Sequence, residues 1–193
     1  IQTLGEHVTN RYVVTSCLLG ACVLFSLVGC FTFINLHLTD EPYQLTTGAL
    51  ANIFAVYLLG VIITPLSTSL LRRFGSARTV RVAIVISMVG VLLTLVTPLW
   101  GVVIGLAIMS SGVFITQSAT ISYIAVNVKK GRSLASGLYY LGYYSGGTLG
   151  AWLCGMAYAR GQWSMTVGLL VIVQILALII ASVGMVKTTV QSK

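Results

Sequence analysis

Long runs of apolar residues without a single charge dominate the pattern of this chain. They cover residues 13–36, 44–71, 82–128, 133–159 and 161–186. A helix needs roughly 20 apolar residues to cross the hydrocarbon of a bilayer, so the 47 residues of 82–128 are long enough for two crossings. Pro98, in the segment "VTPLW", places a hairpin within that run, because proline lacks a backbone donor and disfavours helix in the residue before it. The pattern therefore predicts six transmembrane helices joined by short loops.

The runs exclude the other ways of building a membrane protein. They lack the strict alternation of β-barrel strands and are far too long for single strands. The expected fold class is an all-α membrane protein. Residues 1–11 are expected to be a cytoplasmic N-terminal segment or a linker, residues 12–186 to form the six-helix domain, and residues 187–193 to form a cytoplasmic tail.

Composition supports a membrane protein and argues against a soluble one. The chain is 57% hydrophobic and only 7% charged, whereas soluble domains carry about 25% charged residues. Its net charge of +8 could suggest a nucleic-acid partner, but such a partner requires bases gathered on one soluble face. Here the bases lie between apolar runs, so we expect no nucleic-acid partner and a lipid bilayer as the surroundings.

The bases also predict how the chain is oriented. If the N-terminus is cytoplasmic, ten of the eleven Lys and Arg residues face the cytoplasm: Arg11, Arg72, Arg73, Arg78, Arg81, Lys129, Lys130, Arg132, Lys187 and Lys193. Only Arg160 lies on the other side, with Asp40 and Glu41. Cytoplasmic loops of membrane proteins carry an excess of Lys and Arg. We therefore expect both termini in the cytoplasm and a multi-pass location in a membrane.

Small and polar residues inside the helices mark surfaces that face protein or a cavity. The fifth helix contains "SGLYYLGYYSGGTLG", in which Gly142, Gly146 and Gly150 recur every four residues beside Gly147, a spacing that lets helix backbones touch. Four tyrosine hydroxyls in the same segment need hydrogen-bond partners, which a wet cavity supplies more easily than a dry seam. The candidate cavity residues are Asn35, Asn52, Tyr57, Gln117, Tyr123, Tyr139, Tyr140, Tyr143 and Tyr144. Any one of them could instead belong to an ordinary packing seam between helices.

The third and sixth helices carry few polar residues in their interiors apart from Ser87, Thr94 and Gln174, and are expected to be outer helices facing lipid. His37, near the outer end of the first helix, either contacts Asp40 or Glu41 at the interface or takes part in proton coupling. The four cysteines lie inside apolar runs without metal-binding spacing, as small buried hydrophobes do. The sequence therefore predicts no catalytic residue, no metal and no cofactor.

Together these features resemble one half of a major facilitator superfamily transporter, more narrowly the C-terminal half of bacterial drug:proton antiporters and arabinose-efflux-like permeases. The resemblance covers residues 12–186. In "LRRFGSAR", Arg73 and Gly75 match the R-x-G core of the family's cytoplasmic loop motif. Arg72 stands where the family has Asp, and Ser76 and Ala77 replace bases, so the copy is degenerate.

The resemblance implies a twelve-helix transporter made of two halves, each with two inverted three-helix repeats and a solute site between the halves. In such a protein the first, second, fourth and fifth helices of this chain line the cavity. Arg72, Arg73, Gly75 and Arg78 then belong to the cytoplasmic gate. The implied partners are a small-molecule solute and a missing N-terminal six-helix half.

Two other functions remain open at this point. The chain could work alone, as a homodimer in which a second copy replaces the missing half, although its start at Ile1 favours a fragment of a longer protein. A membrane enzyme or channel is disfavoured, because no predicted span contains a carboxylate, no span carries an arginine series, and no potassium-filter sequence occurs. Efflux of small organic or drug-like solutes by alternating access is the expected function.

Overall fold

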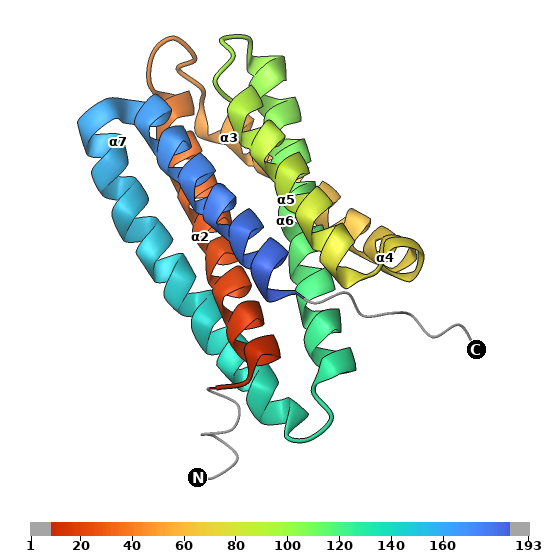
Figure 1. Ribbon diagram of the computed structural model, residues 1–193. Helices are drawn as coiled ribbons and strands as arrows, with labels where there is room; N and C mark the ends of the chain where they lie inside the picture. Colours follow the sequence, from red (N-terminus) through yellow and green to blue (C-terminus); the bar gives the residue numbers. More distant parts are fainter. Residues whose placement is uncertain (1–8, 186–193) are drawn as a thin grey trace.

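The computed structural model describes residues 9–185, and this part of the chain contains helices and turns but no strand. The described helices are α2 (Arg11–Thr39), α3 (Thr47–Phe54), α4 (Val56–Phe74), α5 (Ser76–Leu93), α6 (Leu99–Asn127) and α7 (Arg132–Gly184) (Figure 1). The predicted C-terminal tail, with Lys187 and Lys193, lies outside the described residues, as does most of the predicted N-terminal segment. The all-α fold class is confirmed.

The longest helix, α7, is two helices joined at a sharp turn. Gly161 has φ −146° and Gln162 has φ 54° with ψ −150°, so neither residue is helical. The chain reverses there, which gives a first arm (132–160) and a second arm (163–184) that run in opposite directions (Figure 1). With these two arms counted separately and α3–α4 counted as one crossing, the bundle has the six crossings that the apolar runs predict.

The pattern of apolar runs predicts one of two helix boundaries and does not predict the other. The hairpin at Pro98 is confirmed, because α5 ends at Leu93 and α6 begins directly after Pro98. The second predicted crossing is divided by a turn at Ala55, which separates α3 from α4 and whose N–H donates to the carbonyl of Asn52 at 3.2 Å. No proline or glycine lies at this break, so nothing in the residue pattern could have placed it.

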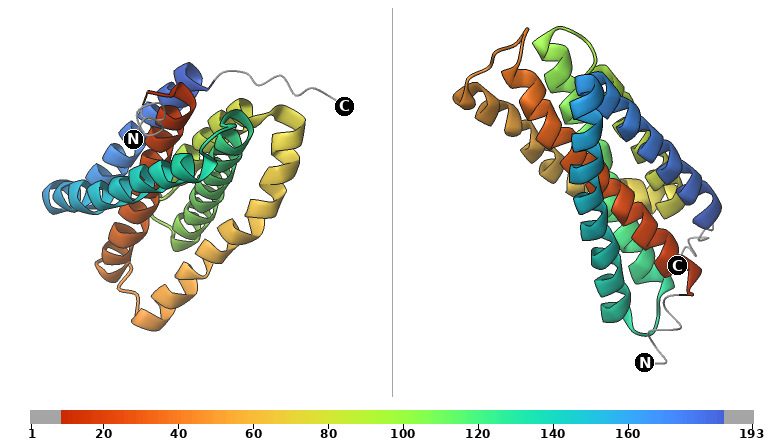
Figure 2. Two further views of the ribbon diagram at one scale, coloured as in Figure 1. Left: turned by 90° about the horizontal axis from the view of Figure 1, so that it is seen from below. Right: turned by 90° about the vertical axis from the view of Figure 1, so that its left-hand side faces the viewer.

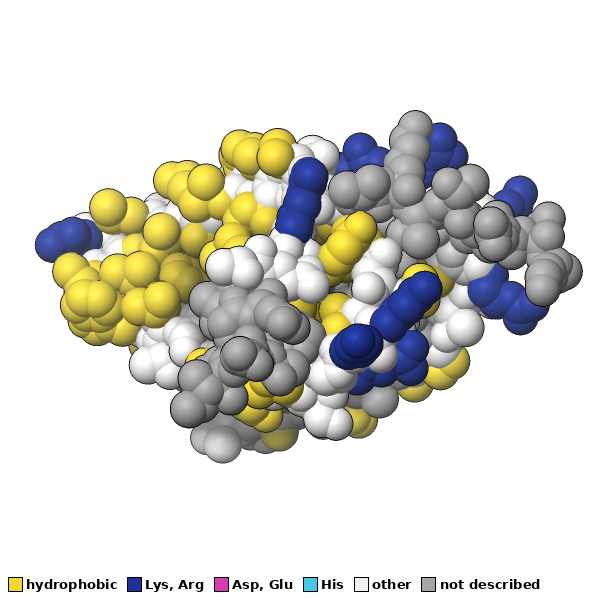
Figure 3. Space-filling model, turned by 60° about the horizontal axis from the view of Figure 1, so that its bottom comes forward, with side chains coloured by type: hydrophobic (Ala, Val, Ile, Leu, Met, Phe, Trp, Pro, Cys, Tyr) yellow, Lys and Arg dark blue, Asp and Glu magenta, His cyan; other side chains and the backbone are white. Residues whose placement is uncertain are grey.

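Side-chain contacts show which helix ends lie together. At one end the rings of Tyr12 and Tyr123 lie 5.7 Å apart, in a cluster that also contains Leu71, Ala77 and Met185. The ends of α2, α4, α5, α6 and α7 that adjoin Arg11 and the loops 72–81 and 129–132 therefore gather here, and we call it the basic end. Figure 3, which looks toward the bottom of Figure 1, shows Lys and Arg side chains on this face.

The other three connections meet at the opposite end. The Tyr43 hydroxyl donates to the carbonyl of Thr97 at 2.6 Å, and Trp163 Nε1 donates to Thr94 Oγ1 at 3.1 Å. Tyr158 donates to Asp40 Oδ2 at 3.3 Å. Successive helices therefore run in alternate directions. Among the described residues, the only base at this end is Arg160, and it shares the end with both described acids.

Two close-packed pairs of helices form the centre of the bundle. Seen from below, α2 and α7 lie on one side and α3–α4 on the other, with α5 and α6 between them (Figure 2). Helix α2 packs along the first arm of α7, and α6 packs against α4 and α5. The backbones of α2 and α7 approach so closely that a Cβ added at Gly146 would lie 2.1 Å from the carbonyl oxygen of Ala21. Only glycine fits such a contact.

Helix α5 and the second arm of α7 expose aliphatic side chains. Val82 and Val89 on α5 are more than half exposed, as are Ile172 and Val183 on the second arm. Facing inward, Gln174 donates from Nε2 to Ser87 Oγ at 2.9 Å and so joins the two helices. Ser87 and Gln174 are therefore turned away from the surface that the exposed aliphatic residues present.

Candidate functional site

Aromatic side chains from three helices meet around Tyr57. Its ring packs edge-on against Phe31 of α2 at 5.4 Å and against Phe114 of α6 at 5.1 Å, with interplanar angles of 86° and 82°. Edge-to-face pairs at this separation stabilise by about 0.5–1.5 kcal/mol beyond the area they bury. Helices α2, α4 and α6 are thus tied together by rings at one point of the bundle. Phe31 also lies 5.9 Å from Phe54 at the end of α3.

The tyrosines of the first arm of α7 continue this group. Tyr143 lies near Tyr57 of α4 and the side-chain amide of Gln117 of α6. Its ring stacks on Tyr139 at 5.9 Å, and Tyr140 stacks on Tyr144 at 6.3 Å, because residues four apart lie one above the other on a helix. We call these residues and their partners the aromatic cluster: Phe31, Tyr57, Phe114, Gln117, Tyr139, Tyr140, Tyr143 and Tyr144.

The four tyrosines divide into an inner and an outer pair. Tyr139 and Tyr143 are 1% and 8% exposed, whereas Tyr140 and Tyr144 are 42% and 65% exposed. The inner pair packs toward α2, where a Cβ at Gly20 would lie 2.6 Å from the Tyr139 ring. Among the described residues the Tyr139 hydroxyl has no hydrogen-bond partner. The outer pair therefore presents aromatic rings and hydroxyls at the surface of the bundle.

The remaining predicted cavity residues lie apart from this group or at its edge. Tyr123 is fully buried at the basic end, against Tyr12, and belongs to a separate packing cluster. Asn35 follows Phe31 by one helical turn and is half-buried, with an Oδ1 that has no partner among the described residues. Asn52 is exposed on α3. The structure thus brings together six of the nine predicted residues.

The sequence did not point to Phe31, Phe54 or Phe114, because phenylalanine adds nothing unusual to an apolar helix. A weak signal was present for one of them: Phe114 precedes Gln117 by three residues and so shares its helix face. His37 lies between the rings of Tyr43 and Trp163, at 5.5 Å and 5.8 Å, at the end opposite the basic loops. It packs there as an interfacial aromatic residue.

The predicted glycines and the loop motif occupy two further places. Cβ atoms at Gly142 and Gly150 would meet the carbonyl oxygens of Cys17 and Phe25 at 2.9 and 2.6 Å, so both glycines line the α2–α7 contact. Gly147 faces Leu24 in the same contact.

In the loop motif, Gly75 separates α4 from α5 with φ 76° and ψ 160°, a conformation that is costly for any other residue. Arg72 and Arg78 are exposed beside it. The Arg73 guanidinium lies 5.4 Å from the centre of the Phe74 ring. The motif thus forms a tight, positively charged turn at the basic end.

Within residues 9–185, no three His, Cys, Asp or Glu side chains gather in a way that could hold a metal ion. The cysteines are free, and Cys30 and Cys154 are buried in the α2–α7 packing. The arrangement gathers aromatic rings, tyrosine hydroxyls and one side-chain amide from α2, α4, α6 and α7.

Comparison with known proteins agrees with this arrangement. The chain is 24% identical over 175 residues to an uncharacterized transporter of Buchnera aphidicola subsp. Schizaphis graminum, covering 91% of this chain and 42% of that protein. It is 26% identical over 177 residues to the uncharacterized MFS-type transporter YybF of Bacillus subtilis, covering 92% of this chain and 44% of that protein. The chain thus spans less than half the length of these curated relatives.

A solved structure shares the fold. The in meso crystal structure of the POT family transporter PepTSo matches 90% of this chain with a TM-score of 0.74, at 16% sequence identity, and the match covers 37% of that transporter. Residues 5–193 also match the sequence profile of the Major Facilitator Superfamily. Because that match takes in nearly the whole chain, together with the alternating six-helix bundle, the chain belongs to the Major Facilitator Superfamily and is an integral, multi-pass membrane protein.

Proposed function

We propose that this chain is the C-terminal six-helix half of a secondary transporter that exports small organic solutes across a bacterial inner membrane by alternating access. Two bundles of this kind rock against each other around a site near the middle of the membrane. The proposal is supported by the lengths of the relatives, since this chain matches 42% of one and 44% of another. A companion bundle of similar size would complete the transporter.

The observation that carries the proposal is the exposed pair Tyr140 and Tyr144, backed by the buried part of the aromatic cluster. The exposed stripe of α5 is aliphatic, with Val82, Val85 and Val89 exposed. Rings and hydroxyls supported by an inner layer instead form a surface that orients amphipathic or cationic organic molecules. We infer that this surface faces the companion half and lines the solute cavity.

The basic end would face the cytoplasm, because Lys and Arg are enriched in cytoplasmic loops. There Arg72, Arg73 and Arg78 would hold the inner gate, with Gly75 forming the tight turn between α4 and α5. The described residues contain acids only at Asp40 and Glu41, outside the helices. If transport is proton-coupled, as in the drug:proton antiporter branch, the coupling carboxylate belongs to the companion half.

Transport by the full-length protein tests this proposal. Cells that express it should accumulate less ethidium, used as a probe cation, than cells without it. Tyr144→Ala should reduce ethidium export about two- to tenfold, the loss expected for one aromatic contact of about 0.5–1.5 kcal/mol. Leu176→Ala, at an exposed position on the second arm of α7, is the matched control and should leave export unchanged. Unchanged export in both Tyr140→Ala and Tyr144→Ala would reject the placement of the cavity.

The same exposed tyrosines also allow a second arrangement, in which two copies of this chain face each other. A second copy could cover the exposed rings of Tyr140 and Tyr144 in place of a companion half. Mass measurement of the expressed chain in lipid nanodiscs separates the two arrangements. A stable dimer of this chain that exports ethidium supports the homodimer, and a monomer without transport supports the half-transporter.

A further inference from the structure

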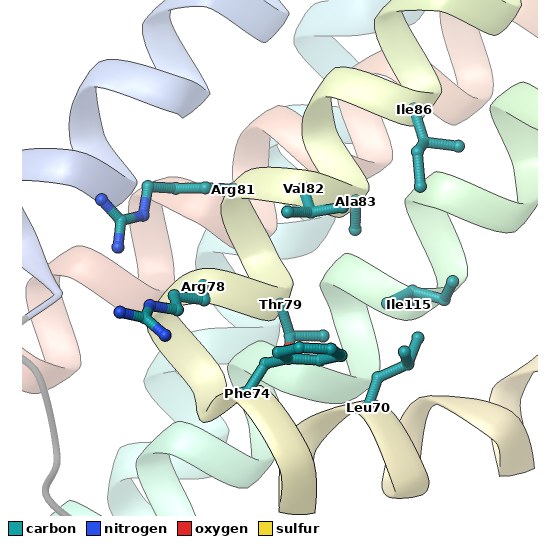
Figure 4. Close-up of a pocket in the computed structure, with 9 residues that line it drawn as sticks. All are labelled: Leu70, Phe74, Arg78, Thr79, Arg81, Val82, Ala83, Ile86 and Ile115. Atoms are coloured by element: carbon teal, nitrogen blue, oxygen red, sulfur yellow. The ribbon is translucent and has the colours of Figure 1, made fainter.

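A groove of about 470 Å³ opens between α4, α5 and α6 at the basic end (Figure 4). Its wall is almost entirely carbon: Leu70 and Phe74 come from α4, Thr79, Val82, Ala83 and Ile86 from α5, and Ile115 from α6. We call it the α5 groove. Its volume lies in the range of small-molecule sites. Arg78 and Arg81 also belong to its lining, and the hydroxyl of Thr79 already donates to the carbonyl of Gly75.

Two arginines stand beside this apolar wall. Arg78 and Arg81 lie one turn apart at the start of α5, and in Figure 4 their guanidinium groups point away from Phe74, Leu70 and Ile115. Arg81 donates from Nε to the carbonyl of Ala77 at 3.0 Å, which holds the side chain close to its own helix. Their stems border the groove while their charges lie next to it.

These charges have no acidic neighbour in the described part of the chain. Both described acids, Asp40 and Glu41, lie at the opposite end of the bundle. Helix α5 also begins here without a side-chain cap, so its first backbone N–H groups add positive potential. The start of α5 therefore offers an uncompensated site for an anion directly beside an apolar groove.

The outer face of α5 continues the apolar surface toward the middle of the bundle. Val82, Val85, Ile86 and Val89 are between 38% and 59% exposed and follow Arg78 and Arg81 along the helix. Charge at the helix start followed by an aliphatic stripe matches the build of a lipid with a charged headgroup above its acyl chains. A soluble anion would make no use of the groove or the stripe.

We propose that the α5 groove binds an anionic glycerophospholipid of the cytoplasmic leaflet. Its phosphate lies on Arg78 and Arg81, and one acyl chain lies in the groove against Phe74 and Ile115. Charge-assisted hydrogen bonds from arginine to phosphate are short and strong, and basic pockets between transmembrane helices select anionic headgroups. The bound lipid would brace the turn between α4 and α5. The site shares Arg78 with the proposed inner gate, but none of its lining residues belongs to the aromatic cluster.

Native mass spectrometry of the full-length protein tests the headgroup contact. Purified protein is titrated with palmitoyl-oleoyl phosphatidylglycerol or with the matching phosphatidylcholine. Arg78→Gln with Arg81→Gln should lower phosphatidylglycerol binding about tenfold or more, since each base near an anionic surface contributes substantially. Lys129→Gln with Lys130→Gln removes the same charge from another loop of the basic end and should change binding less than twofold. Equal losses in the two double variants would overturn the proposal.

The groove contact needs a separate measurement. A fluorophore on Ile86→Cys, in a background without the native cysteines, is reconstituted with phosphatidylglycerol or phosphatidylcholine carrying a nitroxide in the acyl chain. Stronger quenching by the anionic lipid, reversed by excess unlabelled phosphatidylglycerol, supports the site. Equal quenching by both lipids would mean ordinary bilayer contact. Absence of quenching by either would mean that protein covers the groove, and displacement by inorganic phosphate would mean a simple anion site; each of these results overturns the proposal.

A folding control keeps both measurements interpretable. The thermal midpoint and the elution volume of every variant are compared with those of the unaltered protein in detergent without added lipid. If the double variant Arg78→Gln with Arg81→Gln alters the thermal midpoint or the elution volume, single substitutions to Lys are used in its place. These substitutions keep the charge but not the paired donors. Retained selectivity for phosphatidylglycerol in Arg78→Lys and its loss in Arg78→Gln would support the proposal, and equal binding by the two would overturn it.

Discussion

The contact between α2 and the first arm of α7 makes a sharp prediction for Gly146→Ala. The added Cβ would lie 2.1 Å from the Ala21 carbonyl oxygen and 2.4 Å from the Ala21 Cα. Real Cβ atoms essentially never come closer than 3.0 Å to a non-bonded heavy atom of another segment. Because both opposing atoms are backbone, no rotamer change relieves the overlap. The two helices must separate by about 1 Å, which forfeits a quarter to a half of the dispersion energy of each contact that opens.

Two effects of the substitution oppose each other. Alanine favours a helix over glycine by about 0.5–1 kcal/mol. Overpacking a well-packed interior costs about 1–3 kcal/mol. The cost at Gly146 should lie near the upper end of this range, because the added Cβ overlaps backbone atoms of Ala21. The net expectation is a loss of about 1–2 kcal/mol, which corresponds to roughly five- to thirtyfold in the folding equilibrium. Overpacking therefore wins.

The matched control is Gly168→Ala on the second arm of α7, where an added Cβ meets nothing within 4 Å. Both variants are made in the full-length protein and unfolded with increasing sodium dodecyl sulfate, followed by tryptophan fluorescence. Gly146→Ala should unfold at lower detergent than the unaltered protein, and Gly168→Ala at the same or higher detergent. If Gly146→Ala is as stable as Gly168→Ala, the close backbone contact between α2 and α7 is wrong.

Four further substitutions test other contacts by the same unfolding assay. Ser87→Ala should cost about 1–3 kcal/mol, because it leaves the buried Gln174 amide without its hydrogen-bond partner; an unchanged midpoint would contradict that pairing. Trp163→Phe should cost about 0.5–1.5 kcal/mol by removing the hydrogen bond to Thr94, and stability equal to that of the unaltered protein would place the indole elsewhere. Gly75→Ala should cost about 1–3 kcal/mol through backbone strain at φ 76°, whereas Gly48→Ala, in open space, should cost little. Tyr139→Phe should not destabilise, since among the described residues the buried hydroxyl has no partner to lose, and a large loss would reveal one.

The sequence predicted the bundle well because two strong physical constraints act on it. The length of the apolar runs is set by the thickness of a bilayer, and the loop charges are set by the asymmetry of membrane insertion. Pro98 marked the α5–α6 hairpin. Arg160, the single charge between the last two apolar runs, marked the turn at Gly161 between the two arms of α7. The break at Ala55 could not be predicted, because neither proline nor glycine accompanies it.

The candidate site was only partly predictable, for a different reason. Tyrosines and amides stand out in an apolar helix, so Tyr57, Gln117 and the α7 tyrosines could be found from residue type alone. Residue type does not say which two helices pack closely against each other. The ring of Tyr139 packs against Gly20 of α2, and this contact, which the sequence does not show, places Tyr139 in the interior. Phe114 was missed because residue type alone does not distinguish a phenylalanine that packs in a site from one that faces lipid.

The central claim is that the exposed tyrosines of α7 face a watery cavity beside a companion half. Nitroxide labels at Tyr144→Cys and Val89→Cys, each in full-length protein without the native cysteines and reconstituted in lipid, measure this directly. We expect the Tyr144 label to collide mainly with a water-soluble nickel chelate, and the Val89 label mainly with oxygen dissolved in the acyl chains. A Tyr144 label that behaves like the Val89 label would place the tyrosines against lipid and contradict the account.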